Sequence, residues 1–256
     1  MDSPVLIDVA DRIATITLNR PGARNALSGE VLGLLPRLLE DADRDDDVDV
    51  LVLTGADPAF CAGLDLGELG TNATKLIGGE GGTNHRSRGP FPKLTKPLIG
   101  AVNGAAVTGG FELALNCDFL VASERAKFGD THTRVGVMPG WGLSVLLPQA
   151  IGVRRAREMS LTGNFISADE ARQLGLVNHV VAHDELLPFT RALAADIIGN
   201  DQDAVRHLRA TYSAIAHEDD AWETEARDAR VWQRTMSNPE RVAERRAAVV
   251  ERGRRQ

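Results

Sequence analysis

The stretch LIGAVNGAAVTGGFELALNCD, Leu98 to Asp118, decides how this chain folds and holds its strongest candidate site. It begins as an apolar run that fits a buried strand and continues as a helix that starts at two glycines. Glycine costs about 1 kcal/mol inside a helix, but at the first turn it lets a ligand oxygen approach backbone N–H groups that have no helical partner. The helix dipole favours negative charge at the same place. We therefore expect the Gly109 N–H to hold a developing oxyanion, with Gly110 contributing to substrate binding beside it.

A single acid follows these glycines on an otherwise apolar run. Glu112 lies three residues after Gly109, one turn along the same helix face. Its carboxylate is therefore placed to move a proton at the atom next to a carbonyl that Gly109 polarises. The alternative is that the glycines permit close packing of helix on strand and that Glu112 pairs with a buried arginine. The local sequence leaves both interpretations open.

A second junction of the same kind occurs earlier, in FCAGLDLGEL (60–69). Here a loop with Gly63 leads into a predicted short helix, and the N–H of Leu64 is a plausible second donor. Two backbone N–H groups from two helix starts form an oxyanion hole, in which each donor contributes roughly 3 kcal/mol to the transition state.

Apolar patterning elsewhere predicts alternating strands and helices. The run VDVLVLTG (48–55) fits a strand buried on both faces, Ser28 is a candidate N-cap for a helix through about Asp43, and SADE (167–170) is a capping box. From about Asp184 onwards the pattern is helical. The fold class is therefore predicted to be α/β, with a helical region at the C-terminal end.

Composition excludes several classes of function. The 256 residues carry a net charge of -7, which argues against non-specific nucleic-acid binding. The two cysteines, Cys61 and Cys117, fit reduced core thiols, and the spacing of His179 and His183 lacks a third ligand, so no metal site is predicted. The first residues show no signal pattern and no apolar run approaches the roughly 20 residues that span a bilayer. We expect a cytoplasmic protein that does not bind membranes.

Four segments resemble the crotonase family, the enoyl-CoA hydratase/isomerase superfamily: NRPGARNALS (19–28), LTGADPAFCAGLDLGEL (53–69), KPLIGAVNGAAVTGGFELALNCDFLVASERAKFGDTHTRVGVMPGWG (96–142) and LTGNFISADEARQLGLVNHVV (161–181). The resemblance implies a crotonase-like spiral of repeated ββα turns over residues 1–190. It also implies a helical region, residues 191–256, that builds homo-trimers or hexamers. The implied ligand is an acyl-CoA thioester, with no cofactor beyond the CoA that belongs to the substrate.

The resemblance also assigns roles to individual residues. It implies that the thioester oxygen lies between the N–H groups of Leu64 and Gly109. Positions that match the lining of the CoA groove are Arg24, Ala62, Asp65 and Leu66. Trp141 stands where the family has a small residue beside the acyl pocket, so a large ring there would reshape the acyl site. A solvated arginine is the alternative for Arg24, and core packing is the alternative for Trp141.

One position departs from the family pattern. Hydratases of the family use two glutamates, and Glu112 matches the first, but His132 stands at the position of the second. In one interpretation His132 has a pKa near neutral, is oriented by Asp130, and activates water together with Glu112. In a second, Glu112 alone shuttles a proton, as in an enoyl-CoA isomerase; in a third, the oxyanion hole serves decarboxylation or only acyl-CoA binding. We expect an enoyl-CoA hydratase of fatty-acid degradation, in which Glu112 transfers the proton and His132 assists or holds the water.

Overall fold

Two sheets form the body of the protein. The computed structural model describes residues 3–65, 68, 90–135 and 138–215. The larger sheet has six strands in the order β1-β2-β3-β5-β7-β10, in which β1 runs antiparallel to β2 and the other neighbours run parallel. Their bounds are β1 Val5–Ala10, β2 Ile13–Leu18, β3 Val50–Gly55, β5 Leu98–Val102, β7 Phe119–Ser123 and β10 His179–Val181.

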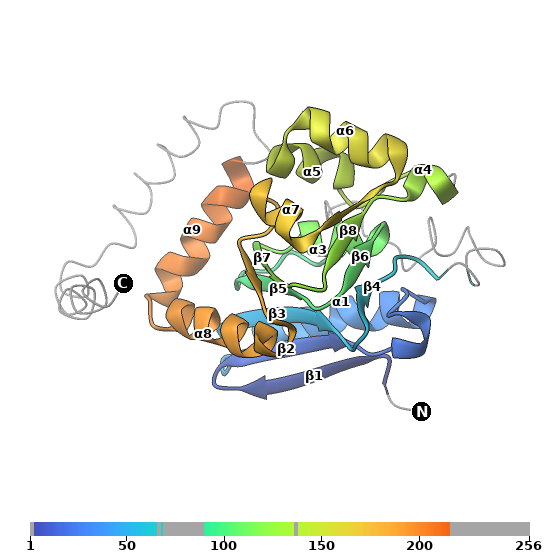
Figure 1. The fold of residues 1–256 in the computed structure, drawn as a ribbon. Coiled ribbons are helices and arrows are strands. Elements are labelled where there is room, and N and C mark those ends of the chain that lie inside the picture. The colour runs from blue at the N-terminus through green and yellow to red at the C-terminus, as the bar shows by residue number, and fades with distance from the viewer. Residues whose placement is uncertain (1–2, 66–67, 69–89, 136–137, 216–256) are drawn as a thin grey trace. The chain divides into compact units, whose positions relative to one another are not determined.

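The smaller sheet has four strands in the order β4-β6-β8-β9, with β9 antiparallel to β8. These strands are β4 Ala59–Cys61, β6 Ala105–Val107, β8 Lys127–Gly129 and β9 Phe165–Ser167. Successive turns of the chain supply one strand to each sheet: β3 then β4, β5 then β6, and β7 then β8 (Figure 1). The last two turns each end in a short helix, α3 (Gly109–Leu115) and α4 (His132–Val135). This arrangement is a spiral of strand–strand–helix turns.

The structure also describes helices before, between and after these strands in the sequence. They are η1 Pro21–Ala23, α1 Gly29–Arg44, α5 Leu143–Ile151, α6 Val153–Thr162, α7 Ala168–Gln173, η2 His183–Glu185, α8 Leu186–Ile198 and α9 Gln202–Ile215. The chain divides into two compact units, Met1–Arg206 and His207–Gln256. The predicted boundary between residues 190 and 191 and the C-terminal trimer-forming region stay predictions, because residues 216–256 lie outside the described part.

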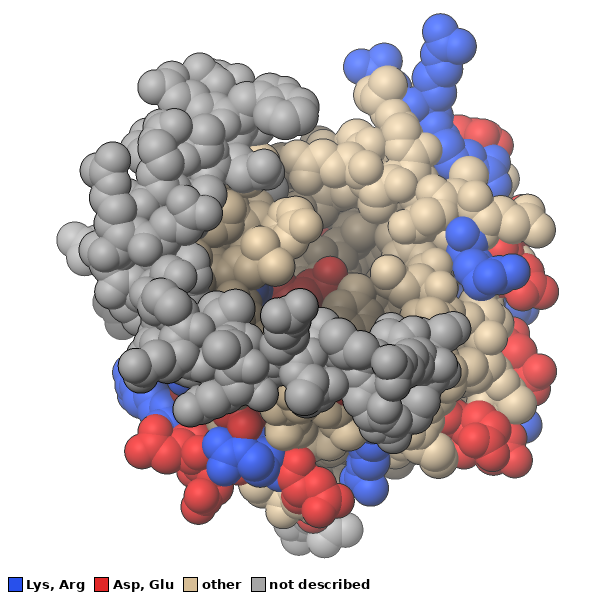
Figure 2. Space-filling model, turned by 90° about the vertical axis from the view of Figure 1, so that its left-hand side faces the viewer, with Lys and Arg blue, Asp and Glu red and all other residues tan. Residues whose placement is uncertain are grey.

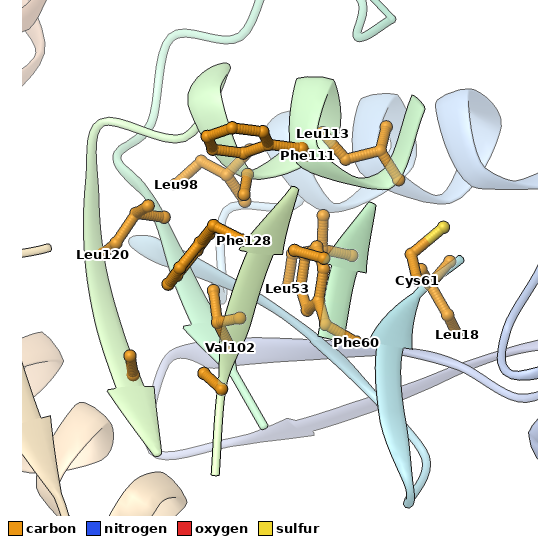
Figure 3. Packing of buried hydrophobic residues seen from close by; sticks show 14 of the residues in the cluster. Leu18, Leu53, Phe60, Cys61, Leu98, Val102, Phe111, Leu113, Leu120 and Phe128 are labelled. Atoms are coloured by element: carbon orange, nitrogen blue, oxygen red, sulfur yellow. The ribbon is translucent and has the colours of Figure 1, made fainter. Parts of the chain in front are cut away.

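The central strands β3 and β5 of the large sheet are buried on both faces, whereas β1 at its edge is mostly exposed. Along β3, Leu51 and Leu53 point into the core that also contains α1 and α3, while Val50 and Val52 join a second cluster with residues of α8. This alternation follows from the two-residue period of a strand. Between the two sheets and α3, the rings of Phe111 and Phe128 pack at a centroid distance of 5.6 Å (Figure 3). This contact packs α3 directly against the smaller sheet.

Several predicted elements are confirmed. Every residue of β3 is buried, as the apolar run predicted. The Ser28 side chain accepts the N–H of Val31 at the start of α1, and Ser167 forms the capping box with Glu170. The strands of the smaller sheet β4, β6 and β9 were not predicted, because three residues are too few to show a period.

The face of the molecule drawn in Figure 2 shows no field of one charge among its described residues. In the face drawn in Figure 2, described acidic and basic side chains lie interspersed, without a broad basic area. Such a mixture fits the net charge of -7 and gives a polyanion little to bind. No helix among the described residues is both long and apolar enough to cross a bilayer.

Candidate active site

Two loop segments meet at Gly63 and Gly109. Gly63 has a φ of 88°, and a Cβ on it would lie 3.2 Å from the Gly109 nitrogen. Both the left-handed backbone and the lack of space require glycine there. The structure thus brings Leu64 next to Gly109, the two residues whose N–H groups are predicted to act together.

The N–H groups of Leu64 and Gly109 are available to a ligand. Leu64 forms a parallel bridge with Leu27, whose N–H donates to the Gly63 carbonyl at 2.8 Å and whose carbonyl accepts the Asp65 N–H at 3.1 Å. This pairing leaves the Leu64 N–H directed away from Leu27. Gly109 is the first residue of α3, so its N–H has no acceptor within the helix. Within the described ranges neither N–H donates a hydrogen bond, which is the condition an oxyanion hole needs.

Thr108 holds the start of α3 in a strained conformation. Its φ of 53° and ψ of -114° are unusual for a β-branched residue. The Thr108 N–H donates to the carbonyl of Gly129 at 2.9 Å, and its hydroxyl lies 2.6 Å from the hydroxyl of Thr131. These contacts fix the turn that presents the Gly109 N–H and connect it to the segment that carries His132.

The Glu112 carboxylate is buried beside this turn, with 2% of the residue exposed. Its Oε1 accepts the backbone N–H of Trp141 at 2.7 Å and that of Leu143 at 3.4 Å. Its Oε2 lies 3.5 Å from Nε2 of His132. In the described part of the chain, the charged neighbour of Glu112 is therefore a histidine and not a buried arginine.

His132 is held between two carboxylates. Its Nδ1 lies 2.6 Å from Oδ1 of Asp130, which also accepts the His132 backbone N–H at 3.1 Å. Because a carboxylate only accepts hydrogen bonds, Nδ1 carries a proton and Nε2 faces Glu112. Asp130 is 1% exposed and His132 is 5% exposed, so water screens neither contact.

The two carboxylates determine the charge of His132. Burial lowers the pKa of the imidazole, but hydrogen bonds and charge from Asp130 and Glu112 outweigh it and raise the pKa to about 9. Burial raises the pKa of Asp130, but the hydrogen bonds it accepts, above all from the His132 side chain, lower it by more. The pKa of Asp130 therefore lies below its ordinary value. The interpretation that gave His132 a pKa near neutral is thus wrong. At neutral pH His132 is an imidazolium, a hydrogen-bond donor and an acid.

Trp141 completes the wall of the site. Its ring atom Cζ3 would lie 3.3 Å from a Cβ on Gly109, so the indole edge packs against the start of α3. The Asn116 side-chain amide donates to the Trp141 carbonyl and to the Glu112 carbonyl, each at 2.8 Å. The indole is half-buried and packs partly on the main core. Trp141 therefore contributes to core packing and also borders the candidate oxyanion hole.

The candidate CoA-binding residues gather at the neighbouring loop. The Ala62 N–H donates to the carbonyl of Arg24 at 3.0 Å, and the Arg24 side chain is exposed. The Asp65 carboxylate lies 3.0 Å from the guanidinium of Arg20. Leu66 lies outside the described residues. The binding role predicted for these positions stays a prediction.

Gly110 has a clear reason to be glycine. A Cβ on it would overlap the carbonyl oxygen of Cys61, so α3 packs directly on β4 at this point. Its predicted role in substrate binding stays a prediction.

The sequence did not point to the residues that hold the site together. Thr108, Thr131 and Asn116 were not predicted, although Asn116 lies one helical turn after Glu112 and could have been proposed from that spacing. Within the described ranges, no group of three or more histidine, cysteine, aspartate or glutamate side chains could hold a metal ion.

Comparison with known proteins identifies the family. The family model described as Enoyl-CoA hydratase/isomerase matches residues 8–256. The chain belongs to the enoyl-CoA hydratase/isomerase family. A probable peroxisomal enoyl-CoA hydratase 1 of Arabidopsis thaliana is 44% identical over 200 residues, which cover 77% of this chain and 73% of the relative.

Solved structures of the family share its fold. The crystal structure of an enoyl-CoA hydratase from Mycobacterium smegmatis has a TM-score of 0.77 at 53% identity, covering 92% of this chain and 100% of that one. A monofunctional enoyl-CoA isomerase from M. smegmatis has a TM-score of 0.72 at 34% identity, covering 87% of this chain and 98% of that one. The predicted crotonase-like α/β spiral is confirmed.

Proposed function

We propose that this protein is an enoyl-CoA hydratase that adds water to a 2-enoyl-CoA in fatty-acid degradation. The observation that carries the proposal is the buried array Asp130–His132–Glu112, which lies close to the unpaired N–H groups of Leu64 and Gly109. Syn hydration needs a base for the water, an acid for Cα and a site for the enolate oxygen. The array and the two N–H groups supply these three functions.

Glu112 takes the proton of water in this mechanism. A protonated His132 cannot accept a proton, whereas the Glu112 carboxylate can. The N–H groups of Trp141 and Leu143 hold Oε1, which leaves Oε2 on the side of His132. Water positioned by Oε2 attacks Cβ of the enoyl group, and its proton passes to Glu112.

His132 supplies the proton for Cα. As the new C–O bond forms, the electron pair of the double bond moves onto the thioester, and the enolate oxygen binds to the N–H groups of Leu64 and Gly109. The Nε2 proton of His132 then passes to Cα, and the thioester carbonyl re-forms. Asp130 keeps Nδ1 protonated throughout, so the ring stays in one orientation.

The site resets without bulk water. After one turnover Glu112 is protonated and His132 is neutral. Because Oε2 and Nε2 lie 3.5 Å apart, the proton can return directly from Glu112 to His132 after a small approach. The original charges are thereby restored for the next substrate.

Isomerisation of a 3-enoyl-CoA is the second candidate function. The same proximity of Glu112 to His132 would let one proton leave Cα and another reach Cγ through a shared enolate. The family likeness extends to a protein described as a monofunctional isomerase. Hydration is preferred because the raised pKa of His132 suits it to the acid role, which leaves Glu112 for the base role.

The same proposal includes the assembly and the binding of CoA. We propose that residues 191–256 form a helical domain that builds trimers or hexamers, and that Arg24, Ala62, Asp65 and Leu66 line the CoA groove. We also propose that Gly110 contributes to the acyl pocket and that no cofactor is needed. The chain has two cysteines, Cys61 and Cys117, too few for a disulfide framework, and we propose a cytoplasmic location.

A two-substrate assay tests the proposed function. The protein is mixed with a short 2-enoyl-CoA, and the conjugated thioester absorbance is followed; hydration predicts its loss. The same protein is mixed with a 3-enoyl-CoA, where isomerisation predicts that the absorbance appears. If neither signal changes while calorimetry still detects acyl-CoA binding, both enzyme functions are refuted and a binding protein remains.

A further inference from the structure

Trp141 has an unusual position for a bulky side chain. Its backbone is bound at both ends: the N–H donates to Oε1 of Glu112 at 2.7 Å, and the carbonyl accepts the Asn116 amide at 2.8 Å. Because Asn116 also donates to the carbonyl of Glu112, the loop cannot move away from α3 without breaking the part-buried hydrogen bonds of the Trp141 backbone to Glu112 and Asn116. The backbone of Trp141 is thus fixed relative to the Glu112 carboxylate, and its half-buried indole packs partly on the main core.

The ring lies beside the place where the thioester oxygen would bind. A Cβ added to Gly109 would lie 3.3 Å from Cζ3 of the Trp141 ring, which is closer than an ordinary van der Waals contact. In the proposed mechanism the reacting carbons of a bound enoyl thioester would lie between the Gly109 N–H and the Glu112 and His132 side chains. The indole, whose edge packs against Gly109, would then flank the acyl chain where it continues beyond Cβ.

We propose that Trp141 determines the acyl-chain preference of this protein and restricts it to short, unbranched 2-enoyl thioesters. This inference rests on the proposed function and adds the substrate class to it. The physical reason is that a rigidly held aromatic ring excludes volume and cannot be moved at low cost, since interiors are close-packed. A longer or branched chain would have to displace an indole whose backbone is bound to Glu112 and Asn116.

A substitution of Trp141 can distinguish the role of its backbone from the role of its indole ring. A substitution removes the indole but keeps the N–H that binds Glu112 and the carbonyl that binds Asn116. Trp141→Ala is therefore expected to change which substrate is preferred more than it changes the chemistry. Trp141→Phe, with a smaller ring, is expected to give an intermediate preference.

The test compares kcat/KM for 2-butenoyl-CoA, 2-octenoyl-CoA and 2-dodecenoyl-CoA in the full-length protein. The wild type is expected to prefer 2-butenoyl-CoA. Trp141→Ala is expected to raise the octenoyl-to-butenoyl ratio by about tenfold or more, the size of effect that a pocket wall has on selectivity. Met138→Ala, in the same loop at a residue 82% exposed, is the matched control and should leave the ratio unchanged.

An unchanged ratio in a folded Trp141→Ala and in Trp141→Phe would overturn the inference, and so would a wild type that prefers the long chains. Binding of saturated butanoyl-CoA and octanoyl-CoA, measured by calorimetry, gives the same comparison without turnover. If the wild type hydrates no substrate, the proposed function fails. In that case, tighter binding of octanoyl-CoA relative to butanoyl-CoA in Trp141→Ala would support the chain-length inference, and an unchanged ratio of the two affinities would refute it.

Discussion

At the scale of single residues, the charge of His132 determines which residue acts as the acid and which as the base in the proposed mechanism. The resemblance to the family predicts a second glutamate at the position of His132, and a carboxylate there would have to be protonated to act as an acid. An imidazolium held by Asp130 already has its proton at neutral pH, because the pKa of His132 is raised to about 9. In the proposed mechanism the replacement therefore preserves the acid function with a different group.

Loss of the Glu112 carboxylate should remove the base. Glu112→Gln is expected to lower the turnover of 2-enoyl-CoA by about 10²–10⁴-fold, the range for a lost acid–base group, while acyl-CoA binding is preserved. Steady-state kinetics and calorimetry measure the two effects. Glu124→Gln, at an exposed position, is the control. Wild-type turnover in Glu112→Gln would show that its carboxylate takes no part.

Removal of the Asp130 charge should change the pH profile. In the wild type the acid form of His132 is lost as pH rises through about 9, so the alkaline limb of kcat/KM should lie there. Asp130→Asn removes a carboxylate that raises the pKa of His132, and the alkaline limb should move to lower pH. A purely structural role of Asp130 would lower activity at every pH without moving the limb.

At the scale of elements, the start of α3 depends on how closely the helix approaches β4. Gly110→Ala would normally stabilise a helix by about 1 kcal/mol. Here the added methyl group overlaps the Cys61 carbonyl, so the free energy of unfolding should instead fall by about 2–3 kcal/mol. Denaturant unfolding measures the change. Gly22→Ala, where nothing lies within 4 Å of the added Cβ, should be nearly neutral; equal effects at the two positions would contradict the packing argument.

Elements with local sequence signals could be predicted, whereas elements that depend on distant contacts could not. The buried strand β3 and the caps of α1 and α7 could be predicted because periodicity and capping are local. The short strands β4 and β6 could not, since each gains its structure from neighbours distant in sequence.

The same division applies to the site. Glu112 and Gly109 could be found from one local stretch, but the bonds from the Trp141 loop to Glu112 and the Thr108–Thr131 contact depend on how α3 meets two other segments. The pKa of His132 depends on the burial and distance of two carboxylates, so it could not be read from the sequence.

At the scale of the whole molecule, the buried charges link the site to stability. The pKa of His132 is raised from an ordinary 6.5 to about 9, so its contribution to stability is fully present below 6.5 and is lost as pH rises through 9. The free energy of unfolding should therefore decline over this window more steeply in the wild type than in His132→Gln. Equal pH dependence in the two proteins, measured by denaturant unfolding, would show that the His132 proton is bound no more tightly in the folded state.

Exchange of the α-protons of a saturated acyl-CoA in deuterated water tests the division of work between Glu112 and His132 most directly. The exchange is followed above pH 9, where His132 is neutral and can take a proton from Cα, and it needs no activated water. We predict that the wild type exchanges these protons, that Glu112→Gln still exchanges them while its hydration activity is lost, and that His132→Gln exchanges none. Loss of exchange in Glu112→Gln with exchange retained in His132→Gln would contradict the assignment and give the Cα proton to Glu112.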